Sequence, residues 1–198
     1  TATEMLSSMI GSFRPTRAEV SDIGNSVYDR SDALLLSTET AIGKYPIRAV
    51  EVMRKTCQFI ESKLAPLGRE LLVHEQINAV VSAGFNLVQE SDLSQSFAAF
   101  VALTENGKTA RILSSLRPNL PIFAVTTKRK IQRQLRLSFG VESFSFDYQS
   151  NKIGQAVKST INFLQKKGKL KKGEKVVMIY GDDWRFPGRT NLVRIQEV

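Results

Sequence analysis

The chain has 198 residues, of which 42% are hydrophobic, and its formal net charge is +9. This length holds one large domain or one and a half ordinary ones, with enough hydrophobic residues for a buried core. No run approaches the roughly 20 apolar residues that cross a bilayer, and the first residues lack the layout of a signal peptide, so a membrane or exported class is not expected.

The first third of the chain predicts two helices and a short strand. Thr16 and Glu19 have the spacing of a capping box, which predicts that a helix starts there and runs to Val27. The run 33–36 is entirely apolar, which is typical of a strand buried on both faces of a parallel sheet. A second helix is predicted from 46 to 64. Its apolar face is Val50, Met53, Cys57, Ile60 and Leu64.

A single strand cannot form a stable sheet, because both of its edges stay unpaired. Residues 1–64 are therefore interpreted as a piece of a larger barrel, and the natural polypeptide is expected to start before Thr1. The next ten residues, 65–74, contain Pro66 and Gly68 and are interpreted as a joint between two domains. His74, the chain's only histidine, has no carboxylate or cysteine near it in the sequence and is interpreted as structural.

A polar cluster directly follows the apolar run. Ser37, Thr38, Glu39 and Thr40 lie between the predicted strand and the helix that begins at Pro46. In α/β barrels the loops at the carboxyl ends of the strands carry the catalytic groups, which favours a functional site here. Ser and Thr are also ordinary helix-capping residues, so their spacing leaves both interpretations open.

From residue 75 onward, helices and strands alternate regularly. This order predicts a three-layer α/β domain, 75–198, with a mostly parallel five-stranded sheet and an antiparallel last strand. The domain is expected to fold alone. The predicted strands are Phe97 to Leu103, Ile122 to Val125, Ser143 to Phe146, Val176 to Tyr180 and Leu192 to Ile195. The predicted helices run from Ile77 to Leu87, Thr109 to Leu116, Lys130 to Leu137 and Ile153 to Gln165.

The positive charge is concentrated in two runs, Lys128 to Arg136 and Lys166 to Lys175. The first is interpreted as the exposed face of an amphipathic helix, and the second as a helix end followed by a turn. Neither run has interleaved aromatic residues on which bases could stack, so no nucleic-acid partner is expected. A nucleic-acid binder stays as a rival hypothesis, which predicts binding with a steep salt dependence.

The single cysteine, Cys57, cannot form an internal disulfide, which fits a reducing cytoplasm. It lies in an apolar helical pattern with no histidine nearby. A buried small hydrophobic residue is therefore favoured over a nucleophile.

Four motifs resemble one enzyme family. Residues 3–22 read TEMLSSMIGSFRPTRAEVSD, 35–46 read LLSTETAIGKYP, 104–117 read TENGKTARILSSLR and 121–126 read PIFAVT. In this order and separation they are similar to the carboxyl-terminal part of pyruvate kinases. The resemblance implies the end of the catalytic (β/α)8 barrel over 1–64, followed by the C-terminal allosteric domain over 75–198.

By this resemblance the complete protein transfers a phosphoryl group from phosphoenolpyruvate to ADP in glycolysis. Thr3 matches a threonine that reaches the substrate, Ser37 a hydroxyl of the proton relay, and Glu39 the carboxylate beside it. Thr38 stands where the family has glycine, which predicts strain if a positive φ is needed. The family's Mg²⁺ and K⁺ cofactors have ligands outside this chain, and none of its own residues is assigned to a metal. The chain alone is therefore expected to be inactive.

In the second domain the resemblance implies a loop that binds a sugar-phosphate effector. Trp184 and Arg185 match a second effector segment, while Glu105 is expected to disfavour a phosphate. The loop residues assigned to the effector are Thr104, Asn106, Gly107, Lys108 and Thr109. Independently of the resemblance, a turn of this kind after a strand and before a helix suits a phosphate, and it also suits a plain helix cap.

Arg17 matches a residue at the interface between barrels, which implies a homo-tetramer. A solvated arginine at a helix start is the alternative interpretation. For the chain as a whole, a free-standing noncatalytic regulatory module that keeps the phosphate loop stays as the second hypothesis.

Overall fold

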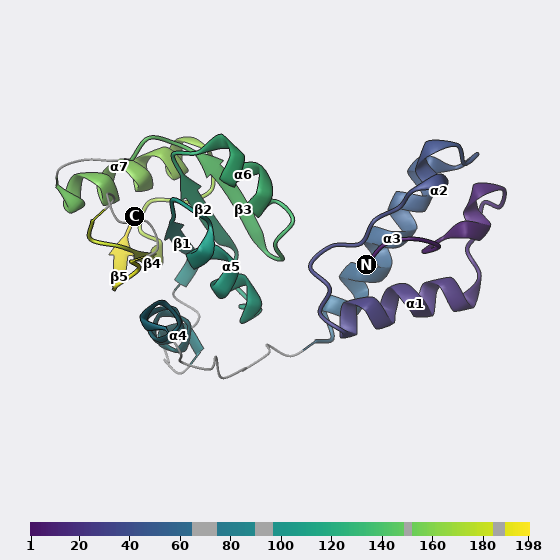
Figure 1. Ribbon diagram of the computed structural model, residues 1–198, viewed down its shortest axis with the longest axis horizontal. Helices are drawn as coiled ribbons and strands as arrows, with labels where there is room; N and C mark the ends of the chain where they lie inside the picture. Colours follow the sequence, from purple (N-terminus) through teal and green to yellow (C-terminus); the bar gives the residue numbers. More distant parts are fainter. Residues whose placement is uncertain (65–74, 90–96, 149–151, 184–188) are drawn as a thin grey trace. The chain divides into compact units, whose positions relative to one another are not determined.

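The computed structural model describes residues 1–64, 75–89, 97–148, 152–183 and 189–198 (Figure 1). The chain divides into two compact units, Thr1–Ala65 and Pro66–Val198. The predicted joint 65–74, including His74, lies outside the described residues, as do Trp184 and Arg185.

The first unit consists of helices and connecting segments. The capping box predicted at the start of α1 is confirmed, because the Thr16 side chain accepts from the Glu19 N–H and the Glu19 side chain accepts from the Thr16 N–H. Met9, Ile23 and Met53 are among the buried side chains that hold the unit together. The helices are η1 (Ser7–Ile10), α1 (Arg17–Tyr28), α2 (Thr38–Ala41) and α3 (Pro46–Glu61).

The strand predicted over 33–36 is wrong in its extent. Only Leu35 makes a bridge, a parallel one to Ala2, and the Leu35 side chain is 59% exposed. An apolar run indicates that a segment prefers to be buried in a sheet. A strand also needs neighbouring strands to pair with, and the described part of this unit contains a single bridge. The apolar face of α3 is also shifted, since Val50 is half exposed while Ala49 is fully buried.

The second unit is built on a five-stranded sheet in the order β3-β2-β1-β4-β5. All neighbouring strands are parallel except β4 and β5, so the mostly parallel sheet and its antiparallel last strand are confirmed. The central strands β1, β2 and β4 are almost entirely buried, as their apolar sequences predict. The strands are β1 (Phe97–Leu103), β2 (Ile122–Thr126), β3 (Val141–Ser145), β4 (Lys175–Tyr180) and β5 (Leu192–Glu197).

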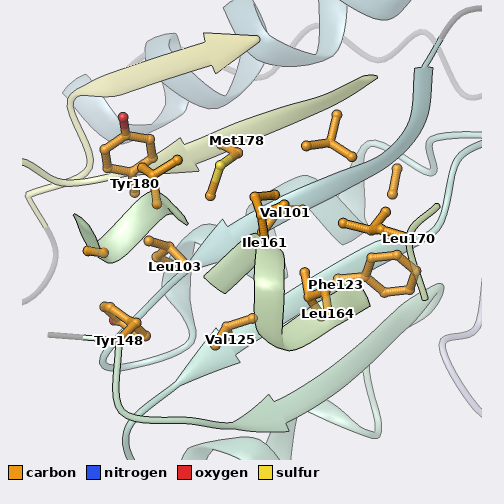
Figure 2. Packing of buried hydrophobic residues seen from close by; sticks show 14 residues of the cluster. Val101, Leu103, Phe123, Val125, Tyr148, Ile161, Leu164, Leu170, Met178 and Tyr180 are labelled. Atoms are coloured by element: carbon orange, nitrogen blue, oxygen red, sulfur yellow. The ribbon is translucent and has the colours of Figure 1, made fainter. Parts of the chain in front are cut away.

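Helices cover both faces of this sheet. On one face α7 (Ile153–Lys166) packs with the alternate residues Val101, Leu103 and Val125, and Figure 2 shows this cluster with Tyr148 at one end. On the other face lie α4 (Gln76–Gln89) and α5 (Lys108–Ser115). Leu135 of α6 (Arg129–Leu135) packs on that same face, against alanines of the central strands. The unit therefore has three layers.

The first basic run is the exposed face of α6, as predicted. Arg129, Lys130 and Arg133 are exposed while Leu135 is buried. The second run follows the end of α7 and turns at Gly168 and Gly173, both with positive φ. None of the helices in the described part of the chain is long and apolar enough to span a bilayer.

Candidate functional site

Two segments far apart in the sequence meet in the first unit. The Leu35 N–H donates to the Thr1 carbonyl at 2.9 Å, within the parallel bridge of Ala2 to Leu35. Because the segments run in the same direction, Thr3 and Ser37 lie one and two residues beyond this bridge, and both are exposed. The two segments that carry these predicted site residues are thus side by side at the bridge.

The backbone at Thr3 is unusual. Its φ is 74°, in the left-handed region that favours glycine. Such a conformation costs on the order of 1–3 kcal/mol for other residues, and strained residues of this kind cluster at functional sites.

The carboxylate of Glu39 is buried and joins both segments. Its side chain is 3% exposed, Oε1 accepts from the Leu6 N–H at 3.0 Å, and Oε2 accepts from the Ser37 N–H at 2.9 Å. Burial alone raises the pKa of Glu39, but hydrogen bonds from its own N–H and from those of Leu6 and Ser37 outweigh burial and hold the pKa below its ordinary value. Glu39 is therefore ionised at neutral pH and fixes the backbone of Ser37.

The loop that carries Ser37 closes into one helical turn, α2. Ser37 stands before the turn, but its side chain does not cap it, so the hydroxyl is not committed to the helix end. Thr38 is helical rather than left-handed, so the strain predicted for it does not arise. Gly43 follows the turn, and a Cβ there would lie 2.4 Å from the Glu39 carbonyl oxygen.

Glu19, whose charge acts on Glu39, has a second role beside the capping that its spacing predicts. Its carboxylate also accepts from the Ser8 N–H at 2.7 Å and from the Ser8 hydroxyl at 2.6 Å. Burial raises the pKa of Glu19, but the hydrogen bonds from Ser8 and Thr16 outweigh it and lower the pKa. No spacing rule could have revealed the contact, because Ser8 lies in a different element.

Two other residues named from the sequence have simpler surroundings. Arg17 is exposed at the first position of α1. Cys57 is half-buried, and burial together with the nearby charge of Glu61 raises the pKa of its thiol. A thiol with a raised pKa is a poor nucleophile at neutral pH.

The second candidate site is the turn between β1 and α5. Gly107 has a φ of 83° and precedes the first residue of α5. The Gly107 N–H donates to the Thr104 hydroxyl oxygen at 2.9 Å, and the Lys108 N–H donates to the Asn106 side-chain oxygen at 3.0 Å. These two N–H groups, which a phosphate would need, are therefore held by the turn itself.

The turn contacts the segment that follows the predicted residues Trp184 and Arg185. The hydroxyls of Thr109 and Thr190 are hydrogen-bonded at 2.7 Å, and both side chains are buried. A Cβ on Gly181 would lie 2.4 Å from the Arg189 carbonyl oxygen, so the backbone at Gly181 lies close to the backbone at Arg189. The Lys108 side chain forms an ion pair with Glu75.

Glu105 lies in the same turn but is not at its rim. It is 9% exposed, and its carboxylate accepts hydrogen bonds from Thr127 and Tyr148. No motif or spacing around Glu105 indicates these partners. Within the described ranges, no group of three or more His, Cys, Asp or Glu side chains could hold a metal ion.

Comparison with protein families separates the chain into two matched regions. Residues 1–50 match the barrel domain of pyruvate kinase, and residues 78–196, more than half of the chain, match its alpha/beta domain. The chain belongs to the pyruvate kinase family.

Individual pyruvate kinases are similar along the whole chain. Pyruvate kinase 2 of Synechocystis sp. is 40% identical over 200 residues, which cover 100% of this chain and 33% of that protein. The pyruvate kinase of Clostridium acetobutylicum is 37% identical over 202 residues, covering 100% of this chain and 42% of that protein. That of Leishmania mexicana is 37% identical over 207 residues, 98% of this chain and 40% of that protein. The chain thus spans between a third and about two fifths of these relatives.

Proposed function

We propose that this chain forms the carboxyl-terminal part of an enzyme that transfers a phosphoryl group from phosphoenolpyruvate to ADP, giving pyruvate and ATP. Residues 1–64 are then the end of the catalytic barrel, and 75–198 the C-terminal domain. The observation that carries the proposal is the site in the first unit, where Glu39 hydrogen-bonds both the segment after Thr3 and the backbone of Ser37.

In this proposal the first unit acts in the second half of the reaction. Phosphoryl transfer leaves the enolate of pyruvate, which must take a proton on carbon. The Ser37 hydroxyl is too weak an acid to be the ultimate donor, but it passes a proton along a chain of water and side chains. Thr3 contacts the substrate, and the ionised Glu39 keeps Ser37 in place.

The first half of the reaction needs positive charge around the transferring group. We assign that charge to Mg²⁺ and K⁺ and to cationic residues outside this chain, as membership of the pyruvate kinase family implies. Bound metal ions would supply electrostatic stabilisation of the phosphoryl oxygens. The chain by itself is therefore expected to turn over no substrate.

The second unit supplies a regulatory site in the same proposal. The turn 104–109 and the segment with Trp184 and Arg185 bind a sugar phosphate, and the contact of Thr109 with Thr190 supports this pairing. Binding would require the phosphate to take over the N–H groups of Gly107 and Lys108 from Thr104 and Asn106.

The complete enzyme is proposed to be a cytoplasmic homo-tetramer with Arg17 at a barrel interface. The alternative function is that of a noncatalytic module that only binds the effector. It is favoured by the second unit's own sheet and its hydrophobic clusters on both faces.

A chimeric enzyme tests the catalytic proposal. The part of Synechocystis Pyruvate kinase 2 that matches this chain is replaced by the chain, and pyruvate formation from phosphoenolpyruvate and ADP is measured. We expect the chimera to be active and the chain alone to be inactive. A folded chimera that binds phosphoenolpyruvate but forms no pyruvate would favour the noncatalytic module.

A further inference from the structure

The carboxylate of Glu105 is buried in the second unit and is surrounded by hydrogen-bond donors. The Glu105 side chain is 8% exposed. Its Oε1 accepts from the Tyr148 hydroxyl at 2.8 Å, and the Thr127 hydroxyl lies 3.0 Å from Oε1 and 2.8 Å from Oε2. The ammonium group of Lys128 lies 3.7 Å from Oε2. Two hydroxyls and one cation thus surround this single anion.

These groups come from three neighbouring strands. Glu105 follows β1, Thr127 and Lys128 follow β2, and Tyr148 follows β3. Because the three strands are parallel, the residues after them meet at the same edge of the sheet. Figure 2 shows Tyr148 at the end of the hydrophobic cluster near Leu103 and Val125, close to the ends of β1 and β2. The Glu105 carboxylate therefore links the loops that follow β1, β2 and β3.

The protonation of the phenol fixes the direction of the main hydrogen bond. Burial raises the pKa of Tyr148, and both the charge of Glu105 and the hydrogen bond to it raise the pKa further. Tyr148 is therefore a neutral donor at any physiological pH and Glu105 is the acceptor. A buried carboxylate without such donors would be strongly destabilising, and removing the carboxylate takes away the acceptor of the Thr127 and Tyr148 hydroxyls.

We propose that Glu105 is a built-in anion, whose carboxylate fills a cradle formed by Thr127, Lys128 and Tyr148 that would otherwise bind a carboxylate or phosphate from solution. It thereby holds the loops after β1, β2 and β3 together without any ligand. The cradle residues Thr127, Lys128 and Tyr148 lie outside the turn 104–109, and Glu105 is the one residue that the cradle shares with it.

Chemical rescue tests the proposal on the full 198-residue chain. Glu105→Ala removes the carboxylate and leaves the donors around an empty space. We expect the melting temperature of the second unit, measured by scanning calorimetry, to fall by roughly 3–10 °C. Sodium acetate should restore at least half of this loss at concentrations where sodium chloride restores little, because acetate binds only to the folded variant. The melting temperature of Glu105→Ala in inorganic phosphate, at the same ionic strength, shows whether phosphate or acetate fits the cradle better.

Two variants serve as controls. Glu142→Ala removes an exposed carboxylate that pairs with Lys169 at 2.7 Å, and it should shift the melting temperature by less than about 2 °C with no acetate effect. Glu105→Gln keeps the shape and one acceptor oxygen, so the cradle stays filled and acetate should again have no effect. Adding Lys128→Ala and Tyr148→Phe to Glu105→Ala should abolish the rescue.

The proposal is overturned if acetate stabilises the wild-type chain and Glu105→Ala equally, or if Glu105→Ala melts like the wild type. If Glu105→Ala does not fold in plain buffer, its refolding yield is compared in acetate and in chloride. A higher yield in acetate supports the cradle, and equal yields contradict it.

Discussion

The buried carboxylate of Glu39 accepts a hydrogen bond from the backbone N–H of Leu6, at 3.0 Å and across 33 residues of sequence. A second bond from the Ser37 N–H makes Glu39 the link between the two segments of the candidate active site. Hydrogen bonds to a charged group contribute about 1.5–3 kcal/mol each to stability, so this link is among the stronger polar contacts in the first unit.

Glu39→Gln should lower the free energy of unfolding at pH 7 by about 1.5–3 kcal/mol. The folded-state pKa of Glu39 is lowered, so its contribution is present above the ordinary value of 4.5 and is lost as the pH falls through the folded pKa. Urea unfolding of both chains between pH 7 and pH 3 measures this. The difference between them should shrink below about pH 4.5, and a constant difference would contradict the assigned ionisation.

Glu19→Ala should destabilise the first unit by about 1–3 kcal/mol, because it breaks the capping box and leaves the N–H groups of Thr16 and Ser8 without their acceptor. Asp22→Ala is the matched control, an exposed carboxylate on the same helix, and should change stability by less than about 0.5 kcal/mol. Chemical denaturation followed by helical circular dichroism measures both. Equal effects would mean that Glu19 does not hold η1.

Gly43→Ala should destabilise the chain, since its Cβ would lie 2.4 Å from the Glu39 carbonyl oxygen and the turn would have to open. Gly24→Ala is the control within the same unit. Its Cβ would meet Ile60 at 3.7 Å, an ordinary contact, so the helical propensity of alanine should stabilise α1 by about 0.5–1 kcal/mol. Opposite signs of the two melting-temperature shifts are expected, and matching signs would refute the close approach.

The buried pair of Thr109 and Thr190 is suited to a double-mutant cycle. Either Thr→Val change alone should cost about 1–3 kcal/mol, because it leaves the other hydroxyl buried without its partner. The double variant should cost clearly less than the sum, with a coupling energy of about 0.5–1.5 kcal/mol. Strict additivity would show that the turn 104–109 and the segment around Thr190 are independent.

The second unit was largely predictable from the sequence, because its strands and helices are local patterns that the unit itself completes. The apolar runs of β1, β2 and β4 find neighbouring strands, and β5 returns antiparallel to β4. The run 33–36 has the same pattern but forms only the bridge of Leu35 to Ala2. The pattern predicts a preference for burial, whereas strand geometry depends on partners that the pattern does not contain.

The sequence could not predict the roles of site residues whose hydrogen-bond partners lie far away in the chain. Thr3, Ser37 and Glu39 were named from a resemblance, but nothing local indicates that Glu39 is bonded to Leu6. Tyr148 likewise has no distinguishing spacing, and only its place after β3 brings it to Glu105. One signal was available, since residues that follow parallel strands gather at one edge of the sheet.

The central claim is that Ser37 belongs to a proton relay for the enolate of pyruvate. It is tested most directly by the exchange of the pyruvate methyl protons in heavy water, followed by proton NMR in the chimeric enzyme. Ser37→Ala should slow the exchange by roughly 100-fold or more while phosphoenolpyruvate still binds. Thr38→Ala, which removes a neighbouring exposed hydroxyl, should leave the exchange within about 3-fold of the parent. Exchange that is unchanged in Ser37→Ala would contradict the account.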